Sequence, residues 1–262
     1  MMLSFRNVSF SYDGPVPVVE YLRFSISSGE SVGLSGATGA GKSTIMKLLL
    51  GLLSGSGDIL VDGLPVSKQN LPAIRKKVGF VLQDSDNQMF MPTVYEDMIF
   101  GPRNYGLSKE ETEKRVDTVL TQLGLQDLKH RHNHKISGGE KRMAAIATIL
   151  AMEPEMIVMD EPSTALDPVN RRRVISTINS RKETKLIASH DLDMILDTCQ
   201  RVLLISRGKL VADGDAAAVL LDKALLEANQ MELPLCVPGW QSCPTSRASP
   251  ASVSWWGSSS TT

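Results

Sequence analysis

The sequence has no apolar run that approaches the roughly 18 to 20 residues needed for a membrane-spanning helix. It also lacks a charge excess, since 28 basic and 29 acidic side chains give a net charge of −1, so the balance does not indicate nucleic-acid binding. Cysteine is scarce, and Cys199, Cys236 and Cys243 form no metal or redox spacing and suit a reducing cytosol. The polar first residues argue against a signal peptide. These absences favour a packed cytosolic protein, for which 262 residues and 42% hydrophobic content are ordinary.

Strand and helix patterns alternate through most of the chain. Short apolar runs predict strands, and apolar residues at helical spacing predict helices. The expected strands cover residues 3–12, 18–27, 31–36, 58–63, 77–83, 155–160 and 185–190, with a hairpin over 201–214. This alternation predicts an α/β fold with a mostly parallel sheet. The block between about Asp84 and Met152 has helical spacing, and Ser108 with Glu111 forms a capping box within it, which predicts a helical lobe inserted into the sheet.

The end of the chain has a different composition. From Leu233 to Thr262 there is no Asp or Glu, and all three tryptophans lie in this segment. Its Ser, Pro and Thr content and weak periodicity predict disorder over 236–262. Two interpretations stay open for this tail. The pair Trp255 and Trp256 could anchor the chain to a membrane or a partner, or the tail could be a dispensable or out-of-frame end.

A glycine-rich loop follows the strand expected at 31–36. Its sequence, GATGAGKST, fits G-x-x-x-x-G-K-[ST] between a strand and a helix. Backbone N–H groups of such a loop converge on phosphate oxygens, and the helix N-terminus adds positive potential. Lys42 is expected to reach the β- and γ-phosphates, and Ser43 offers a hydroxyl to Mg²⁺. The residues predicted to bind ATP here are Gly36, Ala37, Thr38, Gly39, Ala40, Gly41, Lys42, Ser43 and Thr44.

Four further polar side chains stand where expected strands end. Asp160 and Glu161 end an apolar strand, so Asp160 is predicted to hold Mg²⁺ and Glu161 to act as general base on water. Gln83 ends another strand, and its amide could reach Mg²⁺ or the water. His190 ends a third, and its imidazole could touch the γ-phosphate. Because parallel sheets bind ligands at the carboxyl ends of their strands, we predict that Glu161, His190 and Gln83 are catalytic and that Ser43, Gln83 and Asp160 are metal ligands.

The stretch Ile136–Leu150 predicts a helix that begins in an unusual way. Ser137 and Glu140 form a capping box, yet Gly138 and Gly139 occupy the first turn. Each glycine costs about 1 kcal/mol relative to alanine in a helix. The pair therefore predicts that another group approaches this backbone closely.

In their order along the chain, these motifs resemble the ATPase domain of ABC proteins. The matching segments are Gly36–Thr44 (Walker A), Gln83 (Q-loop), Ser137–Glu140 (signature), Met156–Glu161 (Walker B), Ser163–Asp167 (D-loop) and His190 (H-loop). The resemblance spans about residues 3–235. It implies one domain over 1–235 with a P-loop NTPase (RecA-like) core, an N-terminal antiparallel β portion and an inserted α-helical subdomain over about 84–152.

The resemblance also implies a head-to-tail dimer with a second ABC ATPase subunit, either identical or a paralogue. In such dimers the signature of one subunit, here Ser137, Gly138, Gly139 and Glu140, contacts ATP held by the Walker A of the other. Tyr12 stands where the family has its adenine-stacking aromatic residue, although Tyr12 could simply end a strand. One departure is Met143, which stands where a basic residue is common.

A finer resemblance concerns the cargo. Residues 83–107 look like the corresponding region of energy-coupling-factor transporter ATPases, and "SGGEKR", "AIATILAMEPE" and Ala224–Leu235 look like their cobalt/nickel branch. This implies a peripheral subunit on the cytoplasmic face of the membrane that drives Co²⁺ or Ni²⁺ uptake through separate membrane subunits. Met89, Phe90 and Met91 are typical of a groove that grips a partner helix. The Gln83–Phe90 region is therefore predicted to bind a membrane subunit, with packing inside the helical lobe as the alternative.

Other interpretations fit the sequence less well. An energy-coupling-factor ATPase for another micronutrient or a vitamin stays open. A non-transport ABC ATPase working on DNA or ribosomes is disfavoured by the single nucleotide domain and the lack of basic excess. A P-loop small-molecule kinase would not need the Ser137 motif or His190. The histidines of 130–134 are interpreted as a polar connector rather than a metal site, and the arginines of 171–173 as a solvated helix face.

Overall fold

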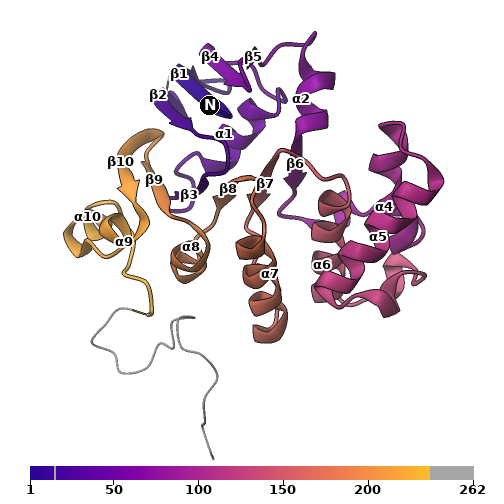
Figure 1. Cartoon of the computed structure of the whole chain (residues 1–262). Coiled ribbons are helices and arrows are strands. Elements are labelled where there is room, and N and C mark those ends of the chain that lie inside the picture. The colour runs from indigo at the N-terminus through magenta and orange to yellow at the C-terminus, as the bar shows by residue number, and fades with distance from the viewer. Residues whose placement is uncertain (15, 237–262) are drawn as a thin grey trace, which may run out of the picture.

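The computed structural model of the chain describes residues 1–14 and 16–236 (Figure 1). The predictions for the tail and its tryptophans fall outside this range, except for the first tail residue, Cys236, which lies in a turn and donates its backbone N–H to Asp193. The strands are β1 (Leu3–Phe10), β2 (Val19–Ile26), β3 (Ser31–Ser35), β4 (Ser56–Val61), β5 (Leu64–Pro65), β6 (Val78–Val81), β7 (Met156–Asp160), β8 (Thr184–Ala188), β9 (Arg201–Ser206) and β10 (Lys209–Asp215). The α-helices are α1 (Lys42–Leu49), α2 (Leu71–Lys77), α3 (Ser85–Gln88), α4 (Val94–Asn104), α5 (Lys109–Leu123), α6 (Gly138–Leu150), α7 (Pro168–Ser180), α8 (Leu192–Thr198), α9 (Ala216–Leu220) and α10 (Lys223–Ala228).

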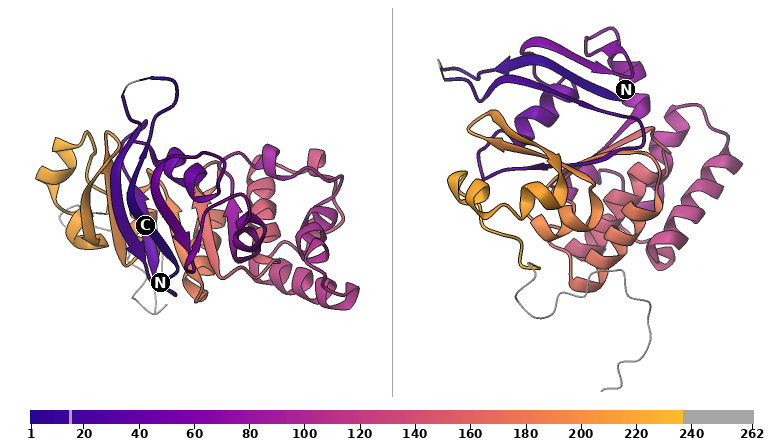
Figure 2. Two further views of the ribbon diagram at one scale, coloured as in Figure 1. Left: turned by 90° about the horizontal axis from the view of Figure 1, so that it is seen from above. Right: turned by 60° about the vertical axis from the view of Figure 1, so that its left-hand side comes forward.

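The strands form two sheets. β2, β1, β4 and β5 make an antiparallel sheet in that order. β10, β9, β3, β8, β7 and β6 make the second, in which β9 through β6 run parallel and β10 pairs antiparallel with β9. The antiparallel sheet lies over one side of the parallel sheet, and helices α6 to α8 lie on the other (Figures 1 and 2). The predicted α/β class with an N-terminal antiparallel portion is confirmed.

The parallel sheet is the middle layer because its strands are apolar on both faces. Along β7, Met156 and Val158 belong to the core shared with α1 and the antiparallel sheet. The alternate residues, Ile157 and Met159, belong to the core shared with the helices. All five residues of β7 are buried. Near-continuous apolar runs of this kind are characteristic of strands covered on both sides.

The helical lobe lies beside the β6 edge of the sheet, where α4, α5 and α6 pack together (Figure 1). The capping boxes predicted at Ser108 and Ser137 are confirmed. Each serine Oγ accepts from the backbone N–H of the glutamate three residues on, and each serine backbone N–H donates to the carboxylate of that glutamate. A third box, Thr93 with Glu96, begins α4. Within residues 1–14 and 16–236 no helix has the length and hydropathy to cross a membrane.

Candidate functional site

The phosphate loop, Gly36–Thr44, connects the end of β3 to the start of α1. Gly39 and Gly41 have φ values of 80° and 108°, which side chains other than glycine rarely adopt. A Cβ atom on Gly36 would lie 2.2 Å from the carbonyl oxygen of Ile205, so this residue must also be glycine. The loop therefore presents backbone N–H groups and the N-terminus of α1 to one space, an arrangement that binds anions.

A cavity of about 470 Å³ opens in front of this loop and collects most of the predicted residues. The Nζ of Lys42 donates to the carbonyl oxygens of Gly36 (2.6 Å) and Ala37 (3.3 Å), and burial lowers its pKa while the Glu161 and Asp160 charges oppose this shift. The lining residues are Val18, Thr38, Gly39, Ala40, Gly41, Lys42, Ser43, Thr44, Gln83, Asp160, Glu161 and His190.

Tyr12 and Val18 lie beside the phosphate loop. The hydroxyl of Tyr12 is 3.4 Å from that of Thr44, and its ring is half exposed and packs edge-on against Phe10. Tyr12 is thus an exposed aromatic surface next to the loop. Val18 was not predicted to line the site, because a valine at the start of an expected strand indicates only core packing.

Asp160 and Ser43 meet inside the cavity. The Ser43 hydroxyl donates to Oδ2 of Asp160 at 3.5 Å. Burial raises the pKa of the Asp160 carboxyl, and the neighbouring Glu161 charge raises it further, while Ser43, Arg142 and Lys42 act in the opposite direction. Two hard oxygen donors beside an adjacent carboxylate make a site that a small divalent cation would stabilise.

Glu161 adopts a left-handed backbone conformation with φ 49°, which is uncommon for a side chain other than glycine. Its carboxylate accepts from the Ser189 hydroxyl (2.9 Å) and the His190 N–H (3.0 Å), and Nδ1 of His190 lies 2.7 Å from Oε2. Only 7% of the residue is exposed. Because β7 and β8 are parallel neighbours, the ends of these strands bring the two predicted residues together. Ser189 was missed, although it directly precedes the predicted His190.

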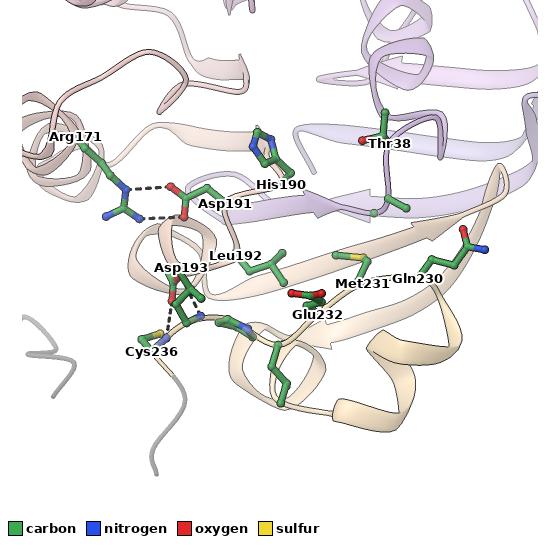
Figure 3. A pocket seen from close by; sticks show the side chains of 15 residues that line it. Thr38, Arg171, His190, Asp191, Leu192, Asp193, Gln230, Met231, Glu232 and Cys236 are labelled. Carbon is green, nitrogen blue, oxygen red and sulfur yellow. Dashed lines mark hydrogen bonds and ion pairs between the residues drawn. The ribbon is translucent and has the colours of Figure 1, made fainter. Parts of the chain in front are cut away.

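A second and larger hollow, of about 840 Å³, adjoins the first (Figure 3). Thr38 and His190 line both. In it, Arg171 forms a two-point ion pair with Asp191 at 2.9 and 3.0 Å. Arg171 is therefore paired with the residue after His190 and is not simply part of a solvated helix face. Asp193 accepts from the backbone N–H groups of residues 235 and 236, which fixes the end of the described chain beside this hollow.

The Ser137–Glu140 turn does not line the cavity in front of the phosphate loop. Ser137 and Gly138 are exposed at the start of α6. A Cβ on Gly138 would meet nothing within 4 Å, and one on Gly139 would meet only the Ala165 carbonyl oxygen at 3.6 Å. Neither glycine has a positive φ. Packing and backbone conformation within this chain thus do not explain the glycine pair.

The histidine-rich connector forms no ligand set in the part of the chain that the structure describes. The rings of His132 and His134 are 5.3 Å apart and tilted. No cluster of three metal-binding side chains occurs among the described residues.

The sequence of this chain is similar to those of ABC transporter ATP-binding proteins. A family profile described as ABC transporter matches residues 19–164. The energy-coupling factor transporter ATP-binding protein EcfA of Methanothermobacter thermautotrophicus is 39% identical over 239 residues, covering 89% of this chain and 77% of that protein. A Geobacter sulfurreducens protein, provisionally named an ABC transporter ATP-binding protein, is 41% identical over 239 residues, covering 91% and 96%.

Solved structures of ABC proteins are also similar to the fold of this chain. The structure of cbiO1 from Clostridium perfringens, part of the ABC transporter complex cbiONQ, superposes with a TM-score of 0.76 at 32% identity and covers 87% of this chain and 93% of that one. A bacterial Atm1-family ABC exporter with ATP bound superposes with a TM-score of 0.76 at 28% identity, covering 87% of this chain and 42% of that one.

Proposed function

The chain belongs to the ABC transporter ATP-binding proteins and is an ATP-hydrolysing transporter subunit, and we propose below the role of each site residue, the partners and the cargo. The observation that carries the proposal is the single cavity that joins the phosphate loop to Gln83, Asp160, Glu161 and His190. Asp160 is the last residue of β7, and the other three follow within two residues of the ends of β6, β7 and β8, so one sheet edge carries the whole set.

The phosphate loop is proposed to hold the ATP phosphates. Lys42 now donates to two loop carbonyls, and phosphate oxygens would replace these acceptors without moving its Nζ far. The exposed ring of Tyr12 beside Thr44 would stack on the adenine. Both contacts would bind the substrate and the transition state equally well. They would therefore position the nucleotide for the groups that act on its γ-phosphate.

The donor set fits Mg²⁺. Ser43 and Asp160 supply two oxygens that already approach each other, and the exposed Gln83 amide lines the same cavity. Mg²⁺ keeps several waters and binds through one or two protein oxygens plus phosphates, which matches so small a set. When bound, it would neutralise phosphate charge during transfer.

Glu161 is proposed to be the general base. Its carboxylate would take a proton from the attacking water, and His190 would stay against both Glu161 and the γ-phosphate. The donors from Ser189 and His190 orient the carboxylate. Its burial excludes bulk water, which strengthens these interactions.

Two such chains, or this chain and a paralogue, are proposed to close head to tail. The exposed Ser137–Glu140 turn has glycines that this chain does not need, and a helix N-terminus is a ready anion site. The γ-phosphate held by the partner subunit would lie against it.

The membrane partner is proposed to bind beside Phe90. This ring is 62% exposed and packs edge-on against the exposed Phe100 at 5.0 Å. The predicted groove needs a correction, because Met89 is buried in the core of the helical lobe and cannot line it. The contact surface is instead a patch of Phe90 and Phe100. Asp97 accepts from the backbone N–H groups of Phe90 and Met91, which holds the patch in place.

Phe90→Asp should release the chain from its membrane subunits, because a charge would replace the apolar centre of the patch. The measurement is co-purification from membranes, together with nucleotide affinity of the released chain. Nucleotide affinity should stay within about threefold. Leu52→Asp is the matched control, since Leu52 is 59% exposed in the turn after α1, away from the patch. A Phe90→Asp chain that still co-purifies would overturn this contact assignment.

The cargo is proposed to be Co²⁺ or Ni²⁺, imported through separate membrane subunits to which this chain binds as a peripheral subunit on the cytoplasmic face. Similarity to the EcfA protein and to cbiO1 supports the energy-coupling-factor type, with another micronutrient as the alternative. The test is uptake of radioactive cobalt and nickel in a strain that lacks this chain, with and without restoration of the gene. Loss of neither ion's uptake would contradict the metal assignment and leave the ATPase intact.

A further inference from the structure

Arg142 lies at the centre of the catalytic edge without touching the cavity. It belongs to the second turn of α6, is 2% exposed and is the largest fully buried side chain of the described residues. Burial of an arginine is costly unless its donors are satisfied. Burial lowers the pKa of its guanidinium to about 10, so the group stays protonated at neutral pH.

All five guanidinium N–H groups have backbone acceptors. Nη1 donates to the carbonyl oxygens of Leu82 and Gln83, the latter at 3.1 Å. Nη2 donates to those of Asp160 and Glu161, both at 2.7 Å. Nε donates to the carbonyl oxygen of Pro162 at 3.4 Å. A guanidinium carries five N–H donors in a planar fork, and this set of acceptors uses all five.

The five acceptors lie on two neighbouring strand ends. Leu82 and Gln83 follow β6, Asp160 ends β7, and residues 161 and 162 come directly after it. One side chain therefore joins the two backbone segments that carry Gln83, Asp160 and the proposed general base. Glu161 is the residue with φ 49°. A backbone in this region persists only where its surroundings over-determine it. Arg142 supplies one such contact at the Glu161 carbonyl, and the Glu161 N–H donates to Ala188 at 2.8 Å.

The same side chain connects this edge to the partner-facing end of α6. Gly138 begins the helix about one turn before Arg142. Next to Arg142, Lys141 pairs with Asp86 of α3. Gln88, also of α3, donates to the Ala145 carbonyl oxygen at 2.6 Å. The loop after β6 and helix α6 thus form one connected unit.

We propose that Arg142 is a positioning residue for hydrolysis, which fixes Gln83 and Glu161 relative to each other and to the Ser137–Glu140 turn. It acts through backbone carbonyls and does not line the cavity in front of the phosphate loop. The inference rests on the proposed role of Glu161. Loss of the five-point contact should lower kcat, because a misplacement of about 1 Å at a catalytic group costs about 10²-fold. Nucleotide affinity should change little, since Gly36–Thr44 does not contact Arg142.

The test uses the full chain in the complex with which it co-purifies, and compares kcat with ATP affinity for Arg142→Gln and Arg142→Lys. We expect kcat to fall about 10²-fold in the glutamine variant and at least about tenfold in the lysine variant, which keeps the charge but has three donors at one point. ATP affinity should stay within about threefold in both. If Arg142→Gln does not fold, Arg142→Lys decides.

Arg181→Lys is the matched control. Arg181 is also a largely buried arginine with side-chain partners, Glu183 and Gln122, but it precedes β8 at the opposite edge of the sheet. It should lower thermal stability without changing kcat per nucleotide-binding site. Wild-type kcat per binding site in Arg142→Lys, with only stability reduced, would overturn the proposal. Failure of the general-base assignment is distinguishable, because it would appear as retained turnover in Glu161→Gln whatever the Arg142 variants do.

Discussion

Glu161→Gln is expected to slow ATP hydrolysis about 10²- to 10⁴-fold, the usual contribution of a general base. The amide keeps an oxygen that can accept from Ser189 or His190, so the geometry around the side chain should survive. The amide cannot take a proton from water. Lys42, Ser43 and the loop backbone are untouched, so ATP should bind as in the wild type. The measurements are single-turnover hydrolysis and the ATP-to-ADP ratio of nucleotide that remains on the purified complex.

The variant should also accumulate the closed dimer, because ATP stays between the subunits when it is not hydrolysed. Glu155→Gln is the matched control, since Glu155 precedes β7 at the opposite end of the strand from Glu161 and pairs with Lys77 on the surface. It should hydrolyse ATP normally. Wild-type turnover in Glu161→Gln would rule out Glu161 as the general base. Gln83 and His190 would then remain as the proposed catalytic residues.

The sequence pattern was sufficient for the parallel core because the relevant signals are local. Apolar runs such as the one before Asp160 are buried on both faces, and they could be read without knowing which strands pair. The same holds for helices α5 and α6, whose capping boxes need only Ser and Glu three residues apart. The edge location of Gln83, Asp160 and His190 followed from strand direction alone.

Features that depend on distant contacts were not visible in this way. The role of Arg142 depends on five carbonyl oxygens from two other segments, and in the sequence it is one basic residue beside a glycine pair. Arg171 was interpreted as solvated because its partner, Asp191, is 20 positions away. Met89 is predicted from the sequence to line a groove with Phe90 and Met91, but its side chain is buried in the core of the helical lobe. In each case the decisive interaction joins elements that only the tertiary structure brings together.

Gly138→Asp is expected to lower hydrolysis by about 10²-fold or more while leaving the fold as stable as the wild type. The added side chain would enter open space, since a Cβ at this position meets nothing within 4 Å. An acidic residue in the first turn also favours a helix by about 0.3 to 1 kcal/mol. The carboxylate would repel an anion that approaches this turn from outside the chain, and like-charge contacts in an interface cost several kcal/mol. Thermal unfolding and the hydrolysis rate of the complex would be measured together.

Helix α5 supplies the control for this argument. It begins with the same capping box, Ser108 and Glu111, but its first helical residue is Lys109 where α6 has Gly138. Comparison of the two helices shows that the cap itself does not require glycine. Lys109→Asp should therefore leave hydrolysis unchanged, and ATP affinity of the single chain should be unaffected in both variants. Full activity in Gly138→Asp would mean that no phosphate held by a second subunit contacts this turn. That result would contradict the head-to-tail arrangement, because the glycine pair is the observation that supports it most directly.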